Sequence, residues 1–130
     1  MIIHKYMNNT GITRKDAMIL VDRYVTKSHT RAHLLETEAI MRALARRCGE
    51  NEDDWGIIGL LHDIDWDMVQ DHVMDHCVMC QDLLQVAGGT EYLIENIISH
   101  GYDNASIPAL QDKRRSTTIQ LVRLHPKPAP

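Results

Sequence analysis

The sequence contains no phenylalanine, and only 5% of its residues are aromatic. Strands usually show period-two alternation rich in aromatic and β-branched residues, and no such alternation is sustained along this chain. Residues with high helix propensity are common instead. The composition therefore predicts an all-α fold, a compact bundle of five to six short helices. At 130 residues the chain is long enough for one domain with a core of its own, spanning residues 1–130.

Long apolar runs are also missing. No stretch of about 18 apolar residues could cross a membrane, and the N-terminus lacks the apolar core of a signal peptide. The three cysteines are an odd number, and two of them, Cys77 and Cys80, lie close together. That is not the pattern of a disulfide framework, so we expect a reducing, cytoplasmic location. A net charge of −4 argues against general affinity for nucleic acids.

Helix boundaries follow from local signals. Thr13, Asn51 and Thr90 each precede an apolar-periodic segment and can serve as N-caps, and Gly49 and Gly88 can end helices. Ser28 or Thr30 can cap the helix that runs up to Gly49. The helices expected on these grounds lie at about 13–26, 28–47, 51–63, 73–87 and 90–100, with a polar turn at 65–72 and a less regular segment at 109–125.

The stretch from Ile58 to Asp67 ends an apolar run with an adjacent histidine and aspartate, His62 and Asp63. Ionised groups are rarely buried without a partner charge or a metal, because desolvation costs several kcal/mol or more. Taken alone, the pair could simply lie at a helix end and contact water. Further histidines along the chain make a metal site the sharper interpretation.

His33 precedes the doublet, and His76 and His100 follow it. His33 shares a helix face with Thr37, Ile40 and Leu44, so it points toward the apolar side. Imidazole and carboxylate ligands together suit Mn, Fe, Co, Ni or Zn. Each histidine also has a plain alternative: a hydrogen-bonded core residue at 33, a surface residue at 76, and a favourable partner of the helix dipole at 100.

Weaker rivals exist nearby. His72 and His76, four residues apart on a helix, could form a metal pair by themselves. Cys77-x-x-Cys80 has zinc spacing, but a structural zinc site needs four ligands, so we interpret the pair as core. Asp65 and Asp67 are interpreted as solvated residues, or as residues that support the ligands.

Three segments carry a resemblance to a known family: HLLETEAIMRALA at 33–45, GLLHDID at 59–65 and IISHGY at 97–102. In this order they resemble the HD superfamily of metal-dependent phosphohydrolases, closest to small bacterial members with a His-Asp-Ile-Asp block. The match runs from about residue 25 to 104. The resemblance implies an all-α HD-domain bundle that hydrolyses a phosphate ester, often a nucleotide, through a metal-activated water.

Carried over by position, the resemblance implies that His33, His62 and Asp63 hold a divalent ion (Mn, Fe, Co, Ni, Zn or Mg), with His62 and Asp63 at the catalytic centre. His76 and His100 correspond to histidines that bind a second metal in some members. Arg31 or Arg42 would hold the phosphate of a small-molecule substrate.

The C-terminal part departs from the family. The last family ligand is an aspartate in an apolar helix, whereas residues 109–118 here are polar and basic. Asp112 and Asp103 are the substitutes that the sequence offers, and the segment 105–130 is expected to be altered or truncated. A missing covering helix would leave apolar surface open and favour a homo-oligomer.

Three hypotheses remain open from the sequence. The chain is a metal-dependent phosphohydrolase, a catalytically idle HD-fold module that binds a nucleotide or a protein partner, or a helical scaffold whose histidines are satisfied core residues.

Overall fold

The computed structural model of the chain describes residues 9–72 and 77–99, and in these ranges it contains helices and no strand. The prediction of an all-α fold with five to six short helices is confirmed. None of the described helices is both long enough and apolar enough to cross a membrane. The helices are α1 (Arg14–Tyr24), α2 (Ser28–Cys48), α3 (Glu52–Leu61), α4 (Trp66–Val69), α5 (Val78–Val86) and α6 (Glu91–Ile98).

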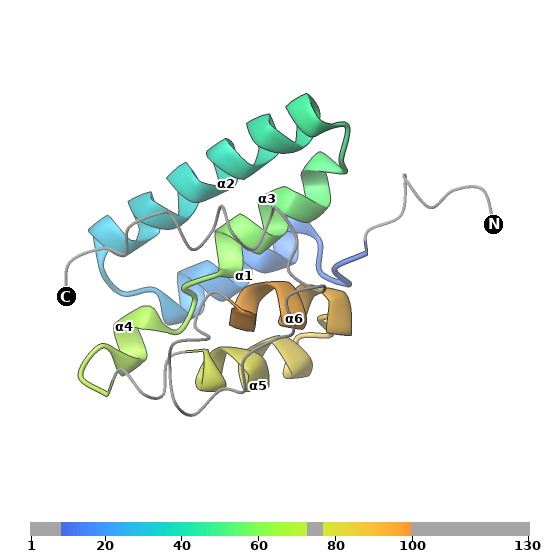
Figure 1. Cartoon of the computed structure of the whole chain (residues 1–130). Helices are drawn as coiled ribbons and strands as arrows, with labels where there is room; N and C mark the ends of the chain where they lie inside the picture. The colour runs from blue at the N-terminus through green and yellow to red at the C-terminus, as the bar shows by residue number, and fades with distance from the viewer. Residues whose placement is uncertain (1–8, 73–76, 100–130) are drawn as a thin grey trace.

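Helix α3 forms the centre of the core. Every residue from Asp54 to Leu61 is buried, so this helix is covered on all sides rather than along one stripe. Its neighbours are α2, which runs beside it as the longest helix, and α1 and α6 (Figure 1). The apolar run of the sequence is therefore the central element, and whatever follows its last turn starts inside the molecule.

A glycine allows α2 and α3 to approach closely. A Cβ atom at Gly59 would lie 2.9 Å from Cγ of Met41 and 3.0 Å from the backbone oxygen of Thr37. Any larger side chain would push the helices apart, because cores are packed at close to crystal density. Thr37 lies one helical turn after His33. The contact at Gly59 therefore fixes where His33 lies along α2 relative to the end of α3.

The predicted N-caps are confirmed. The side chains of Thr13, Asn51 and Thr90 accept hydrogen bonds from backbone N–H groups in the first turns of α1, α3 and α6. At the other end of α2, Gly49 has φ of +73° and terminates the helix. These signals are local, so the sequence alone was sufficient to place them.

The first turn of helix α2 is not capped by the side chain that the sequence predicted. Lys27 occupies the N-cap and makes no side-chain cap bond, and neither Ser28 nor Thr30 caps the helix. The hydroxyl of Thr30 instead donates to Asp67, 37 residues further along the chain. The predicted buried face was also wrong in one position, because Ile40 is 45% exposed whereas Met41 is buried.

The segment after the doublet is more ordered than the polar turn that the sequence predicted. Residues 66–69 form the short helix α4. Helix α5 begins at Val78, because Cys77 has φ of +70°, a left-handed conformation that interrupts a right-handed helix. The first part of the helix predicted at 73–87, residues 73–76, lies outside the described residues.

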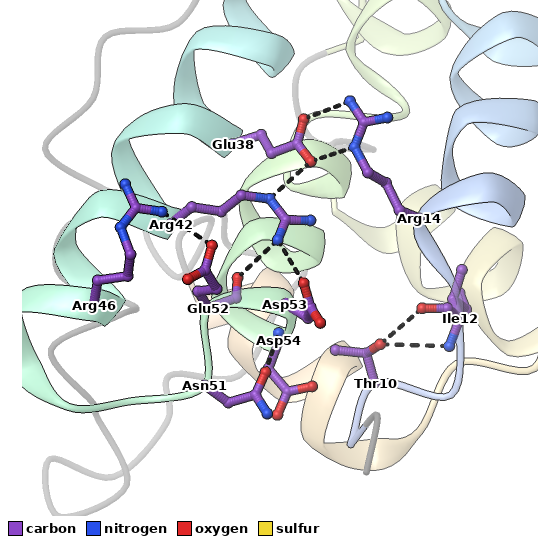
Figure 2. Close-up of polar contacts among 10 residues, drawn as sticks. All are labelled: Thr10, Ile12, Arg14, Glu38, Arg42, Arg46, Asn51, Glu52, Asp53 and Asp54. Atoms are coloured by element: carbon purple, nitrogen blue, oxygen red, sulfur yellow. Dashed lines mark hydrogen bonds and ion pairs between the residues drawn. The ribbon is translucent and has the colours of Figure 1, made fainter. Parts of the chain in front are cut away.

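An ion-pair network joins the first three helices (Figure 2). Glu38 on α2 accepts from Arg14 of α1 and from Arg42, and Arg42 also donates to Asp53 in the first turn of α3. Burial by itself would raise the pKa of Glu38, but the two arginines outweigh it, and the pKa lies below its ordinary value. The carboxylate is thus held ionised at the junction of three helices.

Candidate metal centre

Three side chains from separate parts of the chain meet at the end of α3. Nε2 of His33 lies 3.1 Å from Nε2 of His62 and 3.2 Å from Oδ2 of Asp63. Nε2 of His62 lies 3.1 Å from the same carboxylate oxygen. The three atoms therefore form a nearly equilateral triangle, with two nitrogens and one oxygen facing a common point.

The ends of helices make this convergence possible. Successive residues on a helix diverge by about 100°, so an adjacent pair within a helix cannot address one point. His62 is the C-cap residue of α3, and Asp63 follows in the turn beyond it. His33 faces them from α2, whose close approach at Gly59 is described above. The sequence prediction that the doublet lies where a helix ends is confirmed.

The backbone fixes the orientation of one imidazole. Nδ1 of His62 lies 2.6 Å from the carbonyl oxygen of Gly59, so the Nδ1–H donates to that carbonyl. In the neutral ring, the lone pair is then on Nε2, the atom that faces His33 and Asp63. A hydrogen bond of this kind is how proteins set the tautomer of a metal-binding histidine.

The three donor atoms lie close enough together to bind one divalent ion, with separations of 3.1, 3.2 and 3.1 Å. All three residues are buried, with Asp63 fully inaccessible, and a cation would offset the cost of burying its charge.

Across residues 9–72 and 77–99, this is the one cluster of three or more potential ligands whose donor atoms lie close enough together to hold an ion. His72 is exposed on the surface after α4. The remaining predicted ligands lie outside the described residues, and so does one member of the rival pair. They are His76, His100, Asp103 and Asp112.

Cys77 and Cys80 are both buried and form no disulfide, and their burial agrees with the interpretation of the pair as core residues. Burial raises the pKa of the Cys80 thiol, and the neighbouring charge of Asp65 raises it further.

The two arginines proposed to hold a phosphate both have structural partners. Arg31 forms an ion pair with Asp22 on the surface. Arg42 is engaged with Glu38 and Asp53 (Figure 2). Nine residues separate Arg42 from His33, which is about 13 Å along the helix axis. These contacts favour a structural role for Arg42, and phosphate binding by either arginine stays a prediction.

Asp65 and Asp67 have roles that the sequence did not reveal. Asp65 is fully buried rather than solvated, and its Oδ2 accepts from the backbone N–H of Cys77 and of Cys80 at the start of α5. Asp67 accepts from backbone N–H groups at the start of α2. Each carboxylate thus caps a helix distant in sequence. For Asp67, the one indication in the sequence was Lys27: a lysine side chain cannot cap the helix that follows it, so a partner from elsewhere in the chain was needed.

Comparison with known families adds an independent observation. The family model of the HD domain matches residues 30–130, which is more than half of the chain and includes all three clustered ligands. The chain belongs to the HD-domain family. The HD domain indicates the superfamily of metal-dependent phosphohydrolases, so the resemblance noted in the sequence is confirmed. No curated protein and no solved structure matches this HD domain.

Proposed function

We propose that this HD domain hydrolyses a phosphate ester, with a nucleotide as a candidate substrate, using a divalent ion held by His33, His62 and Asp63. The observation that carries the proposal is the triangle of three buried donor atoms, each 3.1–3.2 Å from the next. Two imidazoles and one carboxylate suit Mn, Fe, Co, Ni and Zn, and the family adds a precedent for phosphate chemistry.

Each residue of the cluster would have a separate role in binding the ion and the substrate. Asp63 contributes the only negative charge of the triangle, so a bound divalent ion keeps a net charge of +1 that attracts a phosphoryl oxygen. His33 and His62 add neutral donors, and the Gly59 carbonyl keeps the ring of His62 in place. When bound, the ion supplies Lewis-acid activation and lowers the pKa of a water that it binds. The buried surroundings strengthen these electrostatic effects.

Metal analysis is the first test. Protein purified without chelator should contain a transition metal, or should bind Mn, Co or Ni stoichiometrically when these are added. Asp63→Asn and His62→Ala should each abolish tight binding, and both should abolish phosphate release from a panel of nucleotides. Asp71→Asn changes an exposed carboxylate eight positions after Asp63 in the sequence and should leave metal content and turnover unchanged.

Two results would contradict the proposal. One is failure of the wild-type chain to bind any of these metals. The other is loss of metal binding in His72→Ala with retention in His62→Ala, which would move the site to the rival pair. A chain that binds metal at His62 and Asp63 but releases no phosphate from the panel would instead be an idle HD module that binds a nucleotide or a protein partner.

The remaining features of the proposal follow from the sequence. We propose a reducing, cytoplasmic compartment, supported by the odd number and the spacing of the three cysteines. We also propose a small-molecule partner rather than nucleic acid, supported by the net charge of −4. The proposed homo-oligomer can be checked by light scattering of the purified chain, with and without added metal.

A further inference from the structure

We infer that Asp67 is a positioning residue for the metal cluster: it holds the first turn of α2 so that His33 stays opposed to Asp63. This inference rests on the proposed metal site and goes beyond it, because Asp67 is not a ligand. Its Oδ2 accepts from the backbone N–H of Thr26 at 2.8 Å and of Lys27 at 2.9 Å. Its Oδ1 accepts from the hydroxyl of Thr30 at 2.6 Å.

Asp67 holds the residues just before α2 as well as a side chain in its first turn. Lys27 at the N-cap makes no side-chain cap bond, and Asp67 accepts from its backbone N–H and from that of Thr26, the residue before it. A negative charge at this end also interacts favourably with the helix dipole. Because Asp67 belongs to the segment that follows the ligand pair, the start of α2 is fixed relative to that segment.

Two parallel connections join the same pair of elements. Thr30 and His33 lie three residues apart on the buried face of α2, about one turn. Asp63 and Asp67 lie four residues apart, across a turn in which the N–H of Trp66 donates to the carbonyl of Asp63 at 3.0 Å. One connection is Thr30 to Asp67, and the other is His33 to Asp63, at 3.2 Å between donor atoms.

The first connection does not need an ion. It can therefore keep Nε2 of His33 near Oδ2 of Asp63 before metal arrives, so that binding does not have to order the start of α2. Partners that orient metal ligands typically account for a ten- to hundredfold change in affinity. Since Asp67 acts through the helix start and not through a bond to a ligand, we expect the lower end, a loss of about tenfold.

A purely structural role for Asp67 makes a different prediction. In that case its replacement would lower the free energy of unfolding without changing the metal affinity of the folded protein. Asp54 provides the matched comparison, because its buried carboxylate also ties down a distant segment by accepting from the backbone N–H and the side-chain amide of Asn9. That contact lies at the opposite end of α3 from the doublet.

The test is a cobalt titration of the full chain, read by visible absorption and by competition with a chelator of known affinity. Asp67→Ala should bind Co²⁺ about tenfold more weakly than wild type, with altered absorption bands. Thr30→Val should weaken binding severalfold, and Thr30→Ser, which keeps the hydroxyl, should restore it. Asp54→Ala should lose stability and keep the wild-type affinity and spectrum.

The outcomes separate this inference from the proposed function. If wild type binds no Co²⁺, the metal site itself is refuted. If wild type binds and folded Asp67→Ala binds equally well with the same spectrum, the positioning role is refuted and the metal site stands. Should Asp67→Ala fail to fold, the Thr30 pair decides: equal affinity for the valine and serine variants refutes the inference, and weaker binding by valine alone supports it.

Discussion

Gly59 on α3 lies against the backbone of α2, and Gly59→Ala tests whether that contact controls both stability and the metal cluster. The added Cβ would lie 3.0 Å from the backbone oxygen of Thr37, where ordinary contact begins at 3.4 Å, and 2.9 Å from Cγ of Met41. The Met41 side chain can adjust, but the backbone at Thr37 cannot move without the helix. We therefore expect α2 to shift by about 0.4 Å in this region, since packed interiors transmit strain.

The expected energy is a difference between two effects. Alanine favours a helix interior over glycine by about 1 kcal/mol. Overpacking a core typically costs about 1–3 kcal/mol. The balance is a loss of about 1 kcal/mol in the free energy of unfolding, which corresponds to a decrease in Tm of about 4 °C for a domain of this size. Because Thr37 lies one turn after His33, the same shift should weaken Co²⁺ binding severalfold.

Urea unfolding in the presence of a chelator measures the stability change, and a cobalt titration measures the change at the cluster. Gly56→Ala is the matched control, three residues earlier on α3. The three atoms nearest to its Cβ would all belong to the Arg42 side chain, with Nε at 2.5 Å. It should therefore disturb the Arg42 ion pairs and leave Co²⁺ affinity unchanged. A Gly59→Ala variant with wild-type stability and affinity would refute this reasoning.

Three further predictions concern stability and reactivity. Glu38→Gln should lower the free energy of unfolding by about 2 kcal/mol at pH 7, because three charged hydrogen bonds from Arg14 and Arg42 are lost or weakened. Since the folded-state pKa of Glu38 is lowered, its contribution is present above its ordinary pKa and is lost as pH falls through the lowered one, so urea midpoints of wild type and variant should converge as the pH falls below that lowered pKa. Asn51→Ala removes the N-cap of α3 and should cost about 1 kcal/mol in thermal unfolding, with no loss contradicting the cap. Iodoacetamide should label the exposed Cys48 of the native chain, and rapid labelling of Cys77 or Cys80 as well would contradict their burial.

The helices could be placed from the sequence wherever their ends are set by neighbours along the chain. Thr13, Asn51 and Thr90 cap the first turn that follows them, so the signal and its effect lie within three residues. The start of α2 was placed correctly near Ser28, but its contacts were not, because the backbone before the helix is held by Asp67, about 40 residues later. No local pattern contains that information.

The buried face of α2 shows a second limit. Helical spacing grouped Ile40 with His33, yet Ile40 is 45% exposed and Glu38 is 5% exposed. The position of α3 decides which stripe of α2 is covered, and a charged residue can take a buried place when Arg14 and Arg42 neutralise it. Judged by apolarity alone, Ile40 would be expected to be more buried than Glu38, and the structure shows the reverse.

The cluster itself was partly visible beforehand. A histidine and an aspartate that end an apolar run are unusual, and His62 and Asp63 could be selected on that basis. His33 was indicated by its apolar face and by the resemblance to HD domains, but its distance of 3.2 Å from Asp63 depends on the crossing at Gly59. The roles of Asp65 and Asp67 required the fold, because each acts on a distant helix.

The segment from His62 to Asp67 therefore carries four side chains that act in three directions. Two converge on one point, Asp65 reaches the start of α5, and Asp67 reaches the start of α2. Loss or gain of a single residue between positions 62 and 67 would rotate every later side chain and disconnect several of these contacts at once. The segment should consequently tolerate a small apolar change at the buried core position, such as Ile64→Val, better than a change of length. In a scan of deletions and insertions along the chain, we expect these six positions to be among the least permissive.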